Sequence, residues 1–356
     1  MGKATDSATI STALLQEVAQ FDAKDRVLSL TAEPFTLLRQ LARTVAQLDV
    51  YDLDYSHLAA LPAQNNMHVH TSVYPQGDAR YDKVIIFVPK GRDVAKAQLW
   101  AAAKSLADDG MVYVCGPTKG GAKTILKDAS ELFAEANTLI FKKRHRVGGL
   151  GKPTATRYPS DWGADPTQRQ QRTFNLPDGL SLLVSTMPGI FSWDALDEGT
   201  RLLLEKVDPE TDIRGKAVLD IGCGNGVIGG WAAKYADRVT MVDDNLLAVE
   251  CSQMTLAQND INNAEALASD VYSALDGQQY DLIVTNPPFH DKFDVTTNVA
   301  HRIIREAKAH LKRDGALIWV ANAFLRYESV AEEHFRSVEL LGGNTKYVVV
   351  KASRPK

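Results

Sequence analysis

Short apolar runs alternate with amphipathic stretches in the C-terminal part of the 356-residue chain. The expected strands are 217–221, 239–242, 266–268, 280–285 and 316–320. The expected helices cover about 227–235, 246–258 and 296–312. Strands and helices that alternate at this spacing predict a doubly wound, mostly parallel α/β sheet. A β-branched run at 346–351 has no helix after it, so we expect it to lie antiparallel at the edge of that sheet.

The same order of elements occurs a first time in the N-terminal part of the chain. The matched runs are 26–30 with 217–221, 50–54 with 239–243, 81–86 with 280–285 and 109–114 with 314–319. A repeat of this length predicts two tandem Rossmann-like domains. Thr31-Ala32-Glu33-Pro34 stands where the later copy has a glycine loop, so we expect the N-terminal copy to be degenerate.

Length and composition are those of an ordinary globular protein with about two domains. Hydrophobic residues make up 45% and charged residues 24%, which excludes disordered and fibrous classes. We expect a degenerate domain at 1–150, a basic linker at 151–183 and a catalytic domain at 184–356. Three scattered cysteines predict neither disulfides nor a metal site. No apolar run approaches the roughly 20 residues of a membrane span, so we expect a cytoplasmic protein.

A glycine-rich loop, Gly222-Cys223-Gly224-Asn225-Gly226, directly follows the strand 217–221. Glycines at a strand-to-helix turn allow a tight bend and a close approach of the backbone to a ligand. Such loops also bind dinucleotides, but the carboxylate of Asp220 would repel a pyrophosphate. An acid at this position suits a ligand with a cationic amino or sulfonium group, such as S-adenosylmethionine (SAM).

Carboxylates end the next two expected strands. Asp243 lies where a carboxylate can accept hydrogen bonds from both hydroxyls of a ribose. Asp270 lies where it can accept one from an adenine amino group. Each aspartate taken alone is also a common helix N-cap. Because both follow strands at the ligand-binding edge of the sheet, they predict a site for an adenosine-containing cofactor.

The turn Asn286-Pro287-Pro288-Phe289-His290 directly follows the strand 280–285. The prolines stiffen the turn and remove two backbone donors. The side-chain oxygen of Asn286 and the carbonyl of Pro287 can then accept both hydrogens of a planar amino group, and Phe289 can stack on its ring. We therefore expect Asn286, Pro287 and Phe289 to be catalytic. Phe289 and His290 are also candidate substrate contacts, although a loop histidine more commonly caps nearby backbone.

These motifs resemble those of class I SAM-dependent methyltransferases with an Asn-Pro-Pro-Phe/Tyr motif, and more narrowly the RsmC-like ribosomal RNA small-subunit guanine-N2 methyltransferases. The other segments that carry the resemblance are 187–192, 196–200, 320–325 and 346–349. The resemblance implies SAM bound by residues 222–226, Asp243 and Asp270, with residues 286–289 catalytic. Thr200 is a further candidate cofactor contact. Phe191 is a candidate substrate contact, with a place in the core as the alternative.

The resemblance implies SAM-dependent N2-methylation of a guanine in ribosomal RNA, with 16S RNA or the small subunit as partner. Large-subunit RNA stays open as the substrate. Adenine-N6 and protein glutamine-N5 methyltransferases share the Asn-Pro-Pro turn but usually have Tyr after it. A SAM- or RNA-binding assembly factor without catalysis is the alternative from another class. We expect a monomer.

One segment is strongly basic although the chain carries a net charge of −4. Residues 142–173 hold eight basic residues against two acidic ones, with the densest group at Lys142, Lys143, Arg144 and Arg146. Such a run is often a solvated linker. An enzyme with a net negative charge must bind RNA through a local basic patch, so we expect these four residues to contact RNA phosphates.

Overall fold

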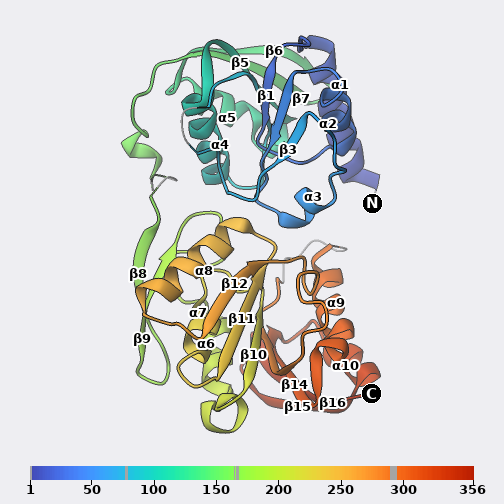
Figure 1. Ribbon diagram of the computed structural model, residues 1–356, viewed down its shortest axis with the longest axis vertical. Coiled ribbons are helices and arrows are strands. Elements are labelled where there is room, and N and C mark those ends of the chain that lie inside the picture. The colour runs from blue at the N-terminus through green and yellow to red at the C-terminus, as the bar shows by residue number, and fades with distance from the viewer. Residues whose placement is uncertain (1, 77–78, 164, 166–167, 289–294) are drawn as a thin grey trace. The chain divides into compact units, whose positions relative to one another are not determined.

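The computed structural model describes residues 2–76, 79–163, 165, 168–288 and 295–356. The chain forms two compact units, residues 1–168 and 169–356, each built around its own seven-stranded sheet (Figure 1). Within the described residues, no helix is both long and apolar enough to cross a membrane.

Unit 1 contains seven strands and five α-helices in the described residues. The strands are β1 (Arg26–Ser29), β2 (Gln47–Val50), β3 (Met67–Val69), β4 (Tyr81–Phe87), β5 (Leu106–Pro117), β6 (Phe133–Lys142) and β7 (His145–Pro153). The helices are α1 (Gly2–Val18), α2 (Phe35–Leu41), α3 (Tyr55–Ala59), α4 (Arg92–Ser105) and α5 (Ala122–Ala129), with short 3-10 turns at Thr118–Gly120 and Ser160–Trp162. α4 and α5 share one hydrophobic core with the sheet, and α1 packs against β5 and β7.

Unit 2 contains a larger set of elements. The strands are β8 (Gln170–Asn175), β9 (Ser181–Thr186), β10 (Ala217–Ile221), β11 (Arg238–Asp243), β12 (Ala264–Ala268), β13 (Tyr280–Thr285), β14 (Leu311–Asn322), β15 (Phe335–Gly343) and β16 (Tyr347–Pro355). The helices are α6 (Glu198–Lys206), α7 (Val227–Ala232), α8 (Leu246–Gln258), α9 (Val295–His310) and α10 (Glu328–His334), and a π-helical turn, η3, spans Pro209–Ile213.

The two sheets have the same topology. Their strand orders are β3-β2-β1-β4-β5-β7-β6 and β12-β11-β10-β13-β14-β16-β15. In both, the first five strands are parallel and the last two pair antiparallel. The prediction of two tandem, mostly parallel Rossmann-like domains is therefore confirmed.

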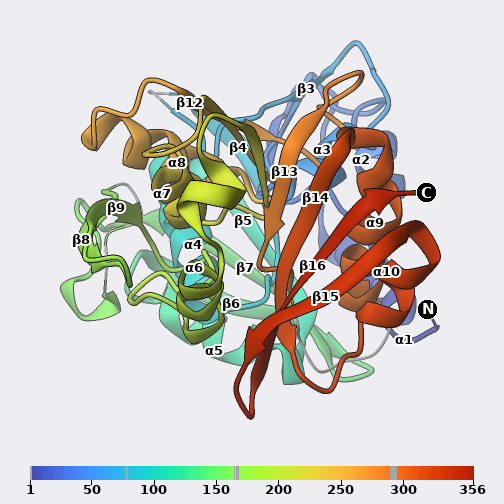
Figure 2. The same cartoon turned by 90° about the horizontal axis from the view of Figure 1, so that it is seen from below.

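The sheet of unit 2 is covered on both faces. α6, α7 and α8 pack on one face together with β9, and α9 and α10 pack on the other (Figure 2). Every residue of β10 is buried, as expected for a central strand covered on both sides. This arrangement leaves the carboxyl ends of the parallel strands as the place where a ligand can reach the sheet.

The structure differs from the expected elements at three places. β16 is antiparallel as expected, but it lies between β14 and β15, and β15 forms the edge. The segment 170–183, expected as part of a linker, belongs to the β8–β9 hairpin of unit 2. β2 ends at Val50, where the expected run 50–54 begins. The sequence did not predict this strand because the polar Asp49 interrupts its apolar pattern. In the structure Asp49 is buried and hydrogen-bonded to His70 (2.8 Å) and Gln47 (2.6 Å).

A carboxylate follows β2 of unit 1 even though the glycine loop is missing there. Asp52 accepts hydrogen bonds from the backbone N–H groups of Ala32 (2.7 Å) and Asp54 (3.0 Å). The ring of His57 lies 3.4 Å from the same carboxylate. The hydrogen bond to Asp52 raises the pKa of His57 to about 9. The cationic side chain of His57 therefore pairs with the carboxylate of Asp52 in unit 1.

Candidate active site

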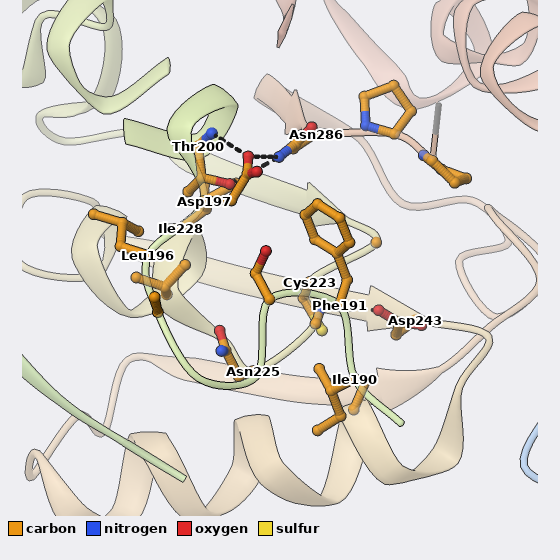
Figure 3. Close-up of a pocket in the computed structure, with 18 of the residues that line it drawn as sticks. Ile190, Phe191, Leu196, Asp197, Thr200, Cys223, Asn225, Ile228, Asp243 and Asn286 are labelled. Atoms are coloured by element: carbon orange, nitrogen blue, oxygen red, sulfur yellow. Dashed lines mark hydrogen bonds between the residues drawn. The ribbon is translucent and has the colours of Figure 1, made fainter. Parts of the chain in front are cut away.

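A cavity of about 650 Å³ lies at the carboxyl ends of the parallel strands of unit 2 (Figure 3). It is lined by the loop after β10, the ends of β11 and β13, the segment before α6 and the residues after β14. Most of its wall is apolar, and a few polar side chains converge on it, notably Asp197, Thr200, Asp243 and Asn286. A largely apolar cavity with a few convergent polar groups is the usual form of a ligand-binding site.

The glycine loop forms the wall of the cavity beside α7. Gly222 and Gly224 adopt left-handed φ angles of 72° and 57°, which favour glycine. A Cβ atom added at Gly222 would meet nothing within 4 Å, so the backbone there lies open to a ligand. Asn225 also lines the cavity and is buried. Gly222, Gly224 and Asn225 thus lie where the sequence predicted cofactor contacts.

Asp243 ends β11 and lines the same cavity. Its two oxygens accept hydrogen bonds from the backbone N–H groups of Gly224 (2.9 Å) and Asn245 (2.8 Å), the pattern also found at Asp52 in unit 1. Burial, together with the nearby charge of Asp244, raises the pKa of Asp243 to about 6. A carboxylate offers about four acceptor positions, so Asp243 can still accept a hydrogen bond from a ligand hydroxyl.

Asn286 is held in one orientation by two neighbours. Its Nδ2 donates to Oδ2 of Asp197 (3.1 Å) and to Oγ1 of Thr200 (2.8 Å), as the dashed lines of Figure 3 mark. A carboxylate only accepts hydrogen bonds, so Asp197 fixes which end of the amide is the NH2 group. The opposite atom, Oδ1, is buried and has no hydrogen-bond partner among the described residues. A buried acceptor without a partner calls for an explanation, and a role in binding or catalysis is one.

The position of Asp197 beside Asn286 is set by the start of α6. It is the N-cap of α6, and its Oδ2 also accepts a hydrogen bond from the N–H group of Thr200 (2.9 Å). Thr200 itself is buried and lines the cavity. The capping interaction therefore fixes the carboxylate that in turn fixes Asn286.

Two exposed aromatic side chains line the mouth of the cavity. Phe191 is 54% exposed and Phe324 is 66% exposed. Side chains of this size at such exposure contribute little to a core, so the core alternative for Phe191 is wrong. Figure 3 shows the ring of Phe191 between Asn286 and Asp243 in that view. Phe324 follows β14 and was not predicted as a contact, although it belongs to one of the segments that carry the family resemblance.

Comparison with known proteins identifies the family. The family described as "Methyltransferase small domain" matches residues 181–351, and "Methyltransferase small domain N-terminal" matches residues 11–139. The ribosomal RNA small subunit methyltransferase C of Shewanella halifaxensis is 35% identical over 333 residues, which cover 91% of this chain and 93% of that protein. The chain belongs to the ribosomal RNA small subunit methyltransferase C family.

Two further relatives agree with this result. The methyltransferase C of Salmonella typhi is 33% identical over 309 residues, covering 85% of this chain and 84% of that protein. A solved 16S rRNA N2 methyltransferase (RsmC) from T. Thermophilus, in complex with AdoMet and guanosine, superposes with a TM-score of 0.85. It is 28% identical and covers 97% of this chain and 92% of its own. The predicted resemblance to the RsmC-like family is confirmed.

Three residues of this chain that the sequence predicted at the cofactor site do not line the cavity. Asp220 is fully buried and does not line the cavity, because the pleat of β10 turns it toward α7, where it accepts from the N–H group of Gly229 (2.9 Å). Burial raises the pKa of Asp220 to about 7. Gly226 packs against α8, where an added Cβ would lie 3.0 Å from Oγ of Ser252. The carboxylate of Asp270 is bonded to Arg302 (2.9 Å) and is absent from the cavity wall.

The remaining predicted residues divide into three groups. Pro287 lines the cavity beside Asn286. Phe289 and His290 lie outside the described residues. The four basic residues belong to unit 1, at the turn between β6 and β7 and not in a linker.

Proposed function

We propose that this chain transfers a methyl group from SAM to the N2 amino group of a guanine in 16S ribosomal RNA. The observation that carries the proposal is the buried, unpartnered Oδ1 of Asn286, fixed by Asp197 and Thr200 in the wall of the cavity. The family membership and the solved relative with AdoMet and guanosine support this choice of cofactor and base.

The described residues fit SAM as the cofactor. Asp243 offers two oxygens at the end of β11 for ribose hydroxyls, and the backbone at Gly222 and Gly224 is open to the ligand. When bound, SAM supplies a methyl group activated by a positively charged sulfur. Asp220 supports the site indirectly. It accepts a hydrogen bond from the N–H group of Gly229 in the first turn of α7, directly after the loop. We propose no contact for Asp270, whose carboxylate is paired with Arg302.

Asn286 makes the amino group of the guanine reactive. The lone pair of an exocyclic amine is delocalised into the ring, so the free amine is a weak nucleophile. A hydrogen bond from the amine to Oδ1 of Asn286 favours the pyramidal form of the nitrogen, in which the lone pair is no longer delocalised into the ring, and it stabilises positive charge that develops on the nitrogen. The carbonyl of Pro287 is the second proposed acceptor. Because the orientation of Asn286 is fixed beforehand, little reorganisation is needed during transfer.

Phe191 is the proposed stacking surface for the guanine. Its ring lies at the mouth of the cavity, half exposed, and every base can stack on an aromatic face. The amine itself would be the nucleophile, so no covalent enzyme intermediate is needed. The new N–C bond would form as the C–S bond of SAM breaks, and the extra N–H proton would be lost to solvent.

The test is methylation in vitro with labelled SAM, followed by nucleoside analysis of 16S and 23S ribosomal RNA. We expect N2-methylguanosine in 16S RNA. Methyl transfer only to 23S RNA, to adenine or to a protein glutamine would contradict the proposal, and no transfer to any of them would favour an assembly factor. Asn286→Ala should remove about 3 kcal/mol of transition-state stabilisation, by analogy with loss of an oxyanion-hole donor. Its dissociation constant for SAM should stay within about twofold of the wild-type value.

The basic turn of unit 1 is the proposed contact for RNA phosphates. Lys143 and Arg144 form the turn between β6 and β7 and are exposed. The guanidinium of Arg146 lies 4.2 Å from the ring centroid of Phe141, which is 52% exposed. Lys142 is also exposed, although it forms an ion pair with Glu17. Exposed cations beside an exposed ring suit a single-stranded RNA segment.

Replacement of Lys142, Lys143, Arg144 and Arg146 by Gln tests this contact. RNA affinity should fall, and the slope of its log–log dependence on salt should flatten by up to about 3, at about 0.7 per phosphate on single strands. SAM affinity should stay the same because the residues belong to the other unit. An unchanged salt slope would mean that the turn is merely solvated. Since ribosomal RNA is the proposed substrate, we place the reaction in the cytoplasm.

A further inference from the structure

A second hollow adjoins the catalytic cavity on the side of β8. It has a volume of about 400 Å³ and shares three wall residues, Phe174, Ala195 and Leu196, with the catalytic cavity. Its other walls come from residues of β8, from Asp194 in the segment before α6 and from Arg201 in the first turn of α6. The shared wall makes the two hollows neighbours within unit 2.

Two arginines line this second hollow. Arg172 projects from β8, and its guanidinium carbon lies 5.2 Å from the ring centroid of Trp193. Its Nη2 donates to Gln170 (3.2 Å), and its buried Nε has no partner among the described residues. Contact with the indole ring restricts the guanidinium plane, so less conformational entropy is lost when it binds a ligand.

Arg201 reaches the same hollow from α6 and is exposed. No hydrogen bond or ion pair of its side chain occurs within the described part of the chain. One acidic residue, Asp194, also lines the hollow, so the two arginines leave it with a net positive charge.

Two other cations of unit 2 are already paired. Lys346 lines the cavity but donates to Glu198 (2.7 Å), and Arg169 forms an ion pair with Glu250. Arg172 and Arg201 are therefore two cations, among the described residues, that a polyanion beside the cavity would meet. Guanidinium groups bind phosphate oxygens through two parallel N–H donors, which makes arginine well suited to a phosphodiester.

We propose that this second hollow binds the RNA backbone next to the target guanosine, with Arg172 and Arg201 contacting phosphates of the flanking nucleotides. The inference rests on the proposed function. A guanine whose N2 atom enters the catalytic cavity must leave its stack, and its flanking phosphates must then pass close to the cavity mouth. The shared wall at Phe174, Ala195 and Leu196 places the arginines on such a path.

The experiment compares Arg172→Gln/Arg201→Gln with a matched control, Arg313→Gln/Arg336→Gln. The control removes the same charge from unit 2 at two exposed strand residues that line neither hollow. Binding of 16S RNA is measured at several salt concentrations, with SAM binding as the check on folding. We expect RNA affinity to fall by about 10- to 100-fold, and the salt slope to flatten by up to about 1.4 relative to the control. Steady-state kinetics should show a higher KM for RNA, with kcat at saturating RNA within about twofold of wild type.

Further outcomes separate the inference from its alternatives. The variant Arg172→Lys/Arg201→Lys keeps both charges and should restore the salt slope but only part of the affinity. Equal RNA affinity in the double Gln variant and the control would overturn the inference. Weaker binding to assembled small subunits with unchanged binding to naked RNA would also overturn it, because the hollow would then contact a ribosomal protein. RNA binding is measured without turnover, so it still reports on the hollow if the proposed methylation fails.

Discussion

Asp197→Ser separates two roles of one carboxylate. In the wild-type protein, Oδ2 of Asp197 caps α6 through the N–H group of Thr200 (2.9 Å) and holds Nδ2 of Asn286 (3.1 Å). Serine is as good an N-cap as aspartate, so the stability of α6 should be kept. Its shorter, uncharged side chain loses the bond to Asn286. Hydrogen bonds to a charged group contribute about 1.5–3 kcal/mol.

The expected result is a slower reaction in a protein of normal stability. The hydroxyl of Thr200 still accepts from Asn286 (2.8 Å), so part of the orientation remains. We therefore expect kcat to fall by about 10- to 100-fold, since each 1.36 kcal/mol of barrier is a factor of ten. The melting temperature should stay within about 2 °C of wild type, because the cap is retained. Single-turnover methylation of RNA, with calorimetry for SAM, measures both.

Asp208→Ser is the matched control. Asp208 is also an N-cap, accepting from the N–H group of Glu210 (3.0 Å) at η3, and it does not line the cavity. Its replacement should leave kcat unchanged. Wild-type turnover in Asp197→Ser would refute the positioning role. A loss of SAM affinity equal to the loss of turnover would also refute it, because the carboxylate would then bind the cofactor and not orient Asn286.

The remaining predictions concern the cofactor site and its packing. Calorimetry should show one SAM per chain, because the carboxylate of Asp52 in unit 1 is already paired with His57. A stoichiometry of two would contradict this. SAM affinity should fall as the pH is lowered through about 6, because Asp243 becomes protonated there and accepts fewer hydrogen bonds from the ribose. Binding titrations at several pH values test this. The variant Asp243→Asn should remove the pH dependence. Gly229→Ala should destabilise the protein by about 1–3 kcal/mol, because the new Cβ would lie 2.1 Å from Sδ of Met241. Gly230→Ala, whose nearest contact would be 3.1 Å, should cost less, and equal melting temperatures would speak against the steric argument.

The strands that carry the site could be predicted closely from the sequence. β10 and β13 have the bounds read from the apolar runs 217–221 and 280–285. Both are buried central strands, so nearly every residue is apolar and the run ends where the strand ends. The edge strand β15 was missed. It exposes Arg336, Glu339 and Leu340, the last at 63%, so its polar and apolar residues do not form a continuous run.

The site residues were predictable only where position along a strand was enough. Asp243 and Asn286 follow strands and line the cavity as expected. Asp220 was misplaced because its side of the sheet depends on the pleat of β10, which turns it beneath α7. Asp270 was misplaced because its partner, Arg302, lies 32 residues away on α9. Asp197 was overlooked for the same reason, since the spacing of 89 residues to Asn286 carries no local signal.

The division of the chain into two sheets has a consequence for its synthesis. All strands of the first sheet, β1 to β7, lie before residue 154, and the core beneath α4 and α5 draws on residues of unit 1 alone. Domains generally fold as units, with the N-terminal one first as the chain leaves the ribosome. The first sheet can therefore be complete while Asp197, Asp243 and Asn286 are still to be translated. A substitution that slows folding of the N-terminal copy would then reduce the yield of active enzyme without changing the kcat of the molecules that fold.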